Sequence, residues 1–156
     1  MSPAATLTNL DLETADRLRA VIGKLGRRLR PTPAALAAGL TPTRISVLLT
    51  VVREGQIRLS DLAQSEGINP TQLSRAIAHL VDSDLVERSA DEGDRRAAWL
   101  KPTAAGRRLT ERIRRERTDA LNGALQELEP GERERIVTAL AALEHLAQRL
   151  RDGEHA

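Results

Sequence analysis

The sequence predicts a mainly α-helical protein with a minor β part, and three observations support this fold class. Leu (24 residues), Ala (23) and Arg (22) dominate the 156-residue chain, and all three favour helices. Phe and Tyr are absent and Trp99 is the only aromatic residue, so a β-sandwich or barrel would lack its usual strand residues. Apolar residues recur at steps of three and four along several segments, which is the spacing of one helical face.

The first third of the chain predicts two helices with a short connection between them. Asn9 caps the first helix, which ends before Pro31 and carries one apolar stripe, at Leu12, Ala15, Leu18, Val21, Ile22, Leu25 and Leu29. Residues 34–40 form a connection of small residues with room for one helical turn. Thr41-Pro42 then starts a helix that ends at Gly55, because a capping Thr followed by Pro is a typical helix start.

The middle of the chain predicts two short helices and three short strands. Ser60 is expected to cap a helix over residues 61–66, and Asn69-Pro70 opens the next helix. A charged turn over residues 91–94 connects the last two strands. The strands are expected at 56–59, 85–88 and 97–100.

The last third predicts two helices separated by Pro130-Gly131. The first begins at Pro102-Thr103 and runs to about Leu128. The second carries an apolar seam at steps of four, three, four and three, at Ile136, Leu140, Leu143, Ala147 and Leu150. Such a seam suits helix–helix packing better than a solvated surface.

The segment over residues 59–101 points to a function. Its two short helices are joined by residues 66–69, where Gly67 supplies the left-handed backbone that a tight turn needs. Ala63 is small where the two helices would cross closely. Apolar side chains fill the wedge between them, at Leu62, Ile68, Leu73 and Ile77. This is the pattern of a helix-turn-helix.

The outward face of the second helix has side chains of the kinds that read DNA. Gln can pair with adenine, Arg with guanine, and small hydroxyls with phosphates or base edges. The following hairpin ends in Arg95 and Arg96, placed as a wing that could reach an adjacent minor groove, and Asp94 is expected to brace Arg96. The candidate DNA-binding residues on the helix are Thr71, Gln72, Ser74, Arg75 and His79.

Two segments resemble the MarR family of winged helix-turn-helix transcription regulators. Residues 67–80, GINPTQLSRAIAHL, are similar to the family's recognition helix. Residues 91–106, DEGDRRAAWLKPTAAG, are similar to its Asp-x-Arg wing, the strand after it and the Leu-Thr-x-x-Gly exit. Residues 40–42 also resemble the start of the family's second helix. The order and length of the elements extend the resemblance over essentially the whole chain.

Three positions depart from the family pattern. Gly93 stands at the wing tip where many relatives have Arg, so minor-groove contact is expected to rest on Arg95 and Arg96. Pro102 replaces an aliphatic residue, so the last strand is expected to end one residue early. Asp84 replaces the usual Gly before a strand, and the turn is expected to survive because Asp tolerates the left-handed backbone region.

The resemblance implies three regions and a mode of action. Residues 1–39 hold an N-terminal helix, residues 40–101 a winged helix-turn-helix domain, and residues 102–156 a long connecting helix and a C-terminal helix. The first and last regions are expected to form a helical dimerisation domain, with contacts at Leu18, Ile22, Leu25, Ile136, Leu140, Leu143 and Leu150. The expected function is that of a homodimeric repressor that binds a palindromic DNA operator and is released by a small amphipathic or aromatic effector.

Composition argues against several other classes of protein. The chain has no Cys, which removes disulfides and thiolate metal sites. No nucleophilic triad, phosphate-binding glycine loop or His-x-x-x-His spacing occurs, so we expect no enzyme, cofactor or metal. No apolar run approaches the ~18 residues of a membrane span and no signal pattern is present, so a soluble, cytoplasmic protein is expected. The net charge of +2 divides into +4 over residues 1–56, +2 over 57–118 and −4 over 119–156, which fits contact of the first two-thirds with a polyanion.

Simpler interpretations of single residues stay open. Arg75 is a DNA contact or a solvated helix charge, and the polar residues before it are contacts or helix caps. His79 is expected at the groove edge or in solvent rather than on a metal. Trp99 is expected to anchor its strand to the core, with stacking on a ligand as the alternative. The basic run in the long helix is expected to be a solvated or domain-bracing face, at Arg112, Arg114, Arg115 and Arg117.

Two alternative functions follow for the whole chain. The first is a ligand-sensing or protein-interaction module that keeps the fold without reading DNA, against which the presence of Arg75, Arg95 and Arg96 argues. The second is a non-specific architectural DNA protein, for which a net charge of +2 is low.

Overall fold

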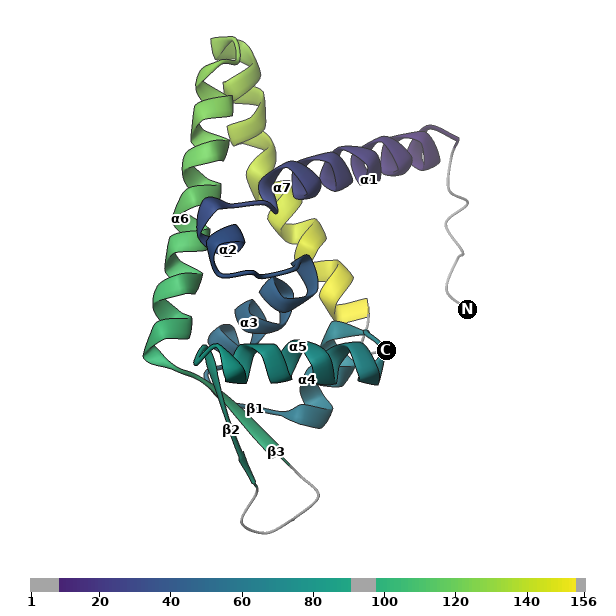
Figure 1. Cartoon of the computed structure of the whole chain (residues 1–156). Helices are drawn as coiled ribbons and strands as arrows, with labels where there is room; N and C mark the ends of the chain where they lie inside the picture. Colours follow the sequence, from purple (N-terminus) through teal and green to yellow (C-terminus); the bar gives the residue numbers. More distant parts are fainter. Residues whose placement is uncertain (1–8, 91–97, 154–156) are drawn as a thin grey trace, which may run out of the picture. The chain divides into compact units, whose positions relative to one another are not determined.

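The computed structural model describes residues 9–90 and 98–153. The fold is mostly helical with one small antiparallel sheet, as the sequence predicts (Figure 1). The chain divides into two compact units, residues 1–117 and 118–156. The helices are α1 (Asn9–Leu29), α2 (Pro33–Ala37), α3 (Pro42–Glu54), α4 (Leu59–Glu66), α5 (Pro70–Asp82), α6 (Ala104–Gln126) and α7 (Pro130–Gly153). The strands are β1 (Ile57–Arg58), β2 (Val86–Ala90) and β3 (Ala98–Pro102).

Three helices begin with the same local device, a capping side chain followed by proline. The Thr32 hydroxyl accepts a hydrogen bond from the Ala35 amide at the start of α2, and Thr41 does the same at the start of α3. The side chain of Asn69 accepts from the Thr71 amide, at 2.8 Å, at the start of α5. Each cap satisfies an amide that has no partner within its helix, and the proline loses nothing there because its missing N–H would be unpaired. The starts predicted at Thr41-Pro42 and Asn69-Pro70 are confirmed.

The cap predicted at Ser60 is wrong. Helix α4 begins at Leu59, directly after β1, and the residue at its cap position, Arg58, makes no side-chain capping bond. Ser60 therefore lies inside the first turn, where its hydroxyl donates to the carboxylate of Asp61 at 3.2 Å. The strand and the helix share a boundary, so no free residue is left between them for a cap.

The sheet has the strand order β1-β3-β2, and both pairs are antiparallel. The prediction that β3 ends before Pro102 is wrong, because Pro102 is paired with Val86 of β2. The Thr103 amide donates to the Leu85 carbonyl, which makes Val86 and Pro102 a non-hydrogen-bonded pair of the antiparallel ladder. On the other side of β3, β1 pairs only as far as Leu100. A proline nitrogen at this position therefore removes no ladder hydrogen bond.

The core of the first unit lies among α2, α3, α4, α5, the sheet and the first half of α6. Its fully buried side chains include Val47, Leu48, Val51, Leu62, Leu80, Leu100 and Ile113. Trp99 does not belong to this core, which corrects the prediction that it anchors β3 there. Successive strand residues face opposite sides, so the burial of Ala98 and Leu100 places Trp99 on the other side of the sheet. There the guanidinium of Arg58 lies over its ring, 5.0 Å from the ring centre.

A tight joint connects the sheet to α6. The Thr103 hydroxyl donates to the Asp84 carbonyl at 2.7 Å and accepts from the Gly106 amide at 2.9 Å, so one side chain caps α6 and holds the turn before β2. Asp84 has a φ of 55°, which confirms that Asp takes the left-handed position here. Gly106 is buried against the Leu85 carbonyl, where a Cβ atom would overlap the oxygen. These contacts give a physical reason for the Thr-x-x-Gly spacing of the exit segment.

The second unit contains the end of α6 and α7, which begins at Pro130 and so confirms the predicted break. All described side chains of α7 are exposed, including five large apolar ones that lie three or four residues apart, at Ile136, Leu140, Leu143, Leu146 and Leu150. Leu140 is 48% exposed and Leu143 40%. Among the described residues, we find no helix with both the length and the apolar character that crossing a membrane requires.

Candidate nucleic-acid interface

The helix-turn-helix is formed by α4 and α5. Gly67 ends α4 with a φ of 57° and a ψ of 24°, which is the left-handed conformation predicted for this turn. One face of α5 is locked into the core by Leu73, Ala76, Ile77 and Leu80, each at most 4% exposed. Because this face is fixed, the opposite face of α5 is held toward solvent.

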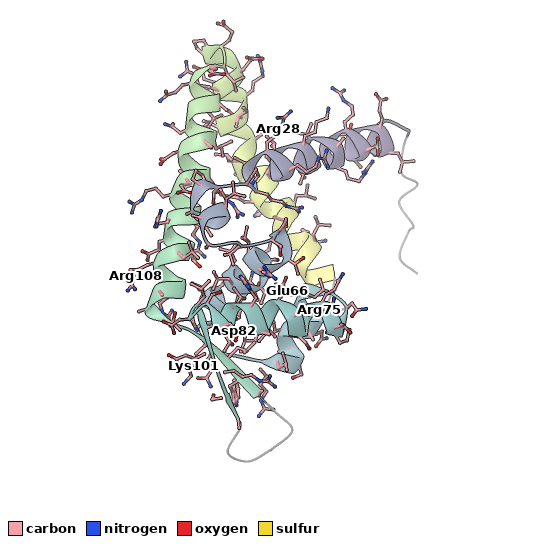
Figure 2. The ribbon with its side chains drawn as sticks, in the orientation of Figure 1. Arg28, Glu66, Arg75, Asp82, Lys101 and Arg108 are labelled. Atoms are coloured by element: carbon pink, nitrogen blue, oxygen red, sulfur yellow. The ribbon has the colours of Figure 1, made fainter. Side chains whose placement is uncertain are left out.

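The predicted recognition residues occupy this solvent-facing side but fall into separate rows. Thr71 and Arg75, four residues apart, lie along the middle of the exposed face, and Figure 2 shows Arg75 projecting from α5. Ser74 lies on the flank that faces β2, where it lines a groove with Arg88. Gln72 is exposed about one sixth of a turn from Arg75, on the opposite flank.

His79 is less accessible than predicted. Its side chain is half-buried, and its Nε2 atom is shielded from solvent without a hydrogen-bond partner among the described residues. It lies seven residues after Gln72 and so shares that flank of α5. Of the five candidate residues on α5, it is the only one that is not exposed.

The predicted wing residues Asp94, Arg95 and Arg96, together with Gly93, lie outside the described residues. The strands on either side of them, β2 and β3, form the antiparallel hairpin that the sequence predicts. Their roles, and the bracing of Arg96 by Asp94, stay predictions.

A groove of about 170 Å³ between α5 and β2 includes a basic residue that the sequence interpretation missed. Arg88 lines it from β2, opposite Ser74 and Asp82 of α5. The signal was present in the strand pattern, because Arg88 stands two residues after the buried Val86 and so faces the same side of the sheet. The sequence alone does not show that α5 lies beside it.

A larger cavity, of about 510 Å³, lies where α1, α3 and the helix-turn-helix turn meet α6. Its lining combines apolar residues with two guanidinium groups, those of Arg30 and Arg117, and with the carboxylate of Glu66. Burial lowers the pKa of Arg117, and the positive charge of Arg30 lowers it further. The Nε atom of Arg117 is shielded from solvent and has no hydrogen-bond partner among the described residues. The cavity therefore favours a bound anion.

Two carboxylates of the first unit tie its elements together. The Thr50 hydroxyl of α3 donates to Glu66 Oε1 at 2.6 Å, which fixes the end of α4 on α3. Glu116 of α6 accepts from the Ala34 amide at 2.9 Å, so it caps α2 from a distant part of the chain. The four arginines of the long helix, predicted to form one solvated or bracing face, differ in their surroundings. Arg112, Arg114 and Arg115 are exposed, whereas Arg117 lines the cavity.

The predicted dimer residues are found on exposed apolar stripes. On α1, Ile22 is 56% exposed and Leu25 49%, while Leu18 is half-buried. On α7 all four predicted residues are exposed. Within the described part of the chain, no group of three or more His, Cys, Asp or Glu side chains is placed to hold a metal ion.

A helix-turn-helix followed by a β-hairpin, with a polar and basic face on its second helix, defines a winged helix-turn-helix DNA-binding protein. Comparison with known proteins agrees with this class. The family model described as MarR family matches residues 40–98. An HTH-type transcriptional regulator of Mycobacterium bovis is 29% identical over 129 residues, which cover 83% of this chain and 89% of the relative.

Solved structures show the same fold. A putative transcriptional regulator of Pseudomonas aeruginosa is 28% identical, with a TM-score of 0.73, over 90% of this chain and 99% of that one. NadR, solved in complex with 4-hydroxyphenylacetate, has the same fold at 23% identity and a TM-score of 0.59, over 94% of this chain and 98% of NadR. Residues 40–98 thus match the MarR family, and over most of its length the chain is similar to HTH-type, DNA-binding transcription regulators. This family consists of regulators rather than enzymes, in agreement with the sequence prediction.

Proposed function

We propose that the chain is a sequence-specific repressor that binds a palindromic operator as a homodimer and is released by a small anionic effector. The observation that carries the proposal is the exposed row of α5, where Thr71 and Arg75 project from a helix whose other face is fixed in the core. A rigidly held helix can present these side chains to base edges in a major groove. A dimer that covers promoter DNA excludes other proteins by occupancy, so repression needs no further contact.

If side chains of α5 contact base edges, removing them should change which DNA sequence the protein prefers. Arg75→Ala and Gln72→Ala are each expected to relax the preference at particular base pairs, with a loss of about 1–3 kcal/mol at the preferred base. Selection of bound duplexes from a random library, performed with wild type and both variants, measures this. If all three proteins return the same consensus, the base-reading role is refuted, because loss of a phosphate contact lowers every affinity alike.

Dimer formation is supported by the apolar stripes on α1 and α7. A palindromic operator presents its half-sites about one helical turn apart, so two copies of α5 must be held at that spacing. Side chains such as Ile22 and Leu140, about half exposed in a single chain, supply apolar surface that a second copy would cover. A closed twofold dimer buries the same stripe on both copies.

Release by an effector is supported by the cavity lined by Arg30 and Arg117. NadR, which has the same fold, binds 4-hydroxyphenylacetate, a small aromatic carboxylate. In this chain an anion placed between the two guanidinium groups would offset both effects that lower the pKa of Arg117. Glu66 and Ile68 line the same cavity and lie in the turn that leads into α5. An effector there would contact the segment that positions the recognition helix.

We therefore expect the effector site to discriminate by charge. Aromatic carboxylates are expected to bind at least about tenfold more tightly than their neutral amides, because a charge-assisted hydrogen bond contributes about 1.5–3 kcal/mol. Arg117→Gln is expected to remove most of this difference. Calorimetric titration with 4-hydroxyphenylacetate and 4-hydroxyphenylacetamide tests both statements. Equal binding of the acid and the amide by the wild-type protein would contradict the anionic effector.

A further inference from the structure

The groove between α5 and β2 lies where a nucleic-acid strand has to pass. The major and minor grooves of a duplex are separated by a sugar–phosphate strand. In the function proposed above, on which this inference rests, α5 enters a major groove, and the wing predicted from the sequence reaches the adjacent minor groove. The strand that divides the two grooves must then run between α5 and the hairpin, which is where the 170 Å³ groove is found.

The polar groups in this groove are suited to a phosphate. Arg88 is exposed, lines the groove from β2, and forms no ion pair within residues 9–90 and 98–153. Ser74 lines the groove from α5 with an exposed hydroxyl that can donate a hydrogen bond. Leu59, Ile77 and Val81 supply an apolar lining, which lowers the competition of water for the two donors.

We propose that Arg88 and Ser74 hold one phosphate of the strand that runs between α5 and the β2–β3 hairpin. The planar guanidinium donates two parallel hydrogen bonds to two phosphate oxygens, and the Ser74 hydroxyl donates a third. Arg88 is thus a positioning residue, because a contact to the backbone fixes the depth and register of α5 and leaves base choice to Thr71 and Arg75.

Asp82 gives the proposal a second consequence. Its carboxylate lines the same groove at the end of α5, and Figure 2 shows Asp82 at the end of α5 near the sheet. A negative charge there opposes a phosphate, so Asp82→Asn is expected to strengthen DNA binding while Arg88→Gln weakens it. Asp82 and Arg88 are both exposed, so neither substitution removes a buried contact.

Lys101→Gln is the matched control. It removes the same charge from the neighbouring strand, but Lys101 is paired with Glu87 whereas Arg88 is paired with Leu100. Cross-strand partners share a face, so Lys101 lies on the side of the sheet away from the groove. Long-range attraction of DNA would be weakened alike in both variants, whereas a direct contact is lost only in Arg88→Gln.

The experiment uses the full chain and the duplex recovered by selection with the wild-type protein. Affinity is measured against salt, and then on a set of duplexes in which single phosphates are replaced by neutral methylphosphonates. Arg88→Gln is expected to lower the salt slope by about 0.9, the value for one phosphate contact, with an unchanged consensus, and Lys101→Gln by much less. One methylphosphonate position is expected to weaken wild type but not Arg88→Gln, and Arg88→Lys is expected to recover part of the slope.

The results separate this inference from the proposed function. If wild type shows no sequence preference, the proposed function fails, whereas the salt slopes of Arg88→Gln and Lys101→Gln still decide the phosphate site. If wild type is selective but Arg88→Gln and Lys101→Gln behave alike, or every methylphosphonate weakens wild type and Arg88→Gln equally, the phosphate site alone is overturned. Circular dichroism of each variant establishes that the fold is retained.

Discussion

Replacing Leu140 and Leu143 together with Glu is expected to leave the chain monomeric and to abolish tight operator binding. Both side chains are on the exposed apolar seam of α7, which a second copy is proposed to cover. Burying two unpaired carboxylates in such an interface costs several kcal/mol. A monomer engages only one half-site and loses the gain from simultaneous attachment, although every DNA-reading side chain is intact.

Thr138→Glu with His145→Glu is the matched control for this double substitution. Both residues are exposed on α7, and they lie on the side of the helix opposite the seam. This variant is expected to remain dimeric and to bind the operator. Light scattering after size-exclusion chromatography measures the mass in each case. A wild-type chain that is monomeric at micromolar concentration and still protects a palindromic site would overturn the dimer proposal.

The second large effect is expected at Gly106. Its backbone lies so close to the Leu85 carbonyl that an added methyl group must displace either the start of α6 or the turn before β2. Neither segment can move easily, because the Thr103 hydroxyl is hydrogen-bonded to the Asp84 carbonyl in the turn and to the Gly106 amide in α6. We expect Gly106→Ala to lower the free energy of unfolding by about 3 kcal/mol or more. Thermal unfolding at a fixed protein concentration should then show a midpoint lower by roughly 10 °C.

Gly123→Ala provides the comparison for Gly106→Ala. Gly123 lies in the same helix, and a Cβ atom there would meet nothing within 4 Å. Removing a helical glycine at an open position is expected to raise stability by up to about 1 kcal/mol, since Ala has the higher helix propensity. Opposite signs for the two substitutions would assign the loss at Gly106 to the contact with Leu85. A drop of similar size in both would contradict that assignment.

Much of the fold was predictable because its boundaries are set by local chemistry. A capping side chain followed by proline fixes the starts of α3 and α5, and Gly55 and Gly67 end α3 and α4 with positive φ. These devices depend on residues next to one another in sequence, so the sequence is enough to find them.

The errors arose where a distant part of the chain decides the local structure. Pro102 continues β3 because of how β1 and β2 border that strand, and α4 begins before Ser60 directly after β1, whose residues pair with the distant β3. Trp99 faces away from the core because strand alternation gives the core side to Leu100. In each case the prediction used residue type, whereas the outcome depends on which strand is the neighbour.

In the candidate site, too, features set by neighbouring residues were predictable and features set by distant segments were not. The exposed face of α5 could be predicted from helical spacing, and Thr71, Gln72, Ser74 and Arg75 are exposed there. The pairing of Arg88 with Ser74 across a groove, and of Arg30 with Arg117 in a cavity, joins residues that are far apart in sequence. No periodicity in the sequence brings such residues together.

The position of Trp99 has a consequence for spectroscopy. The chain has no Tyr and no other Trp, so its absorbance and emission near 280 nm and above come from one indole on β3. That ring lies beneath the Arg58 guanidinium, on the strand that leads out of the hairpin. Fluorescence of the unlabelled protein is therefore a local signal from the winged domain, uncontaminated by the helices of the second unit. A stopped-flow trace recorded on mixing with DNA would follow events at the sheet in real time, without any attached dye.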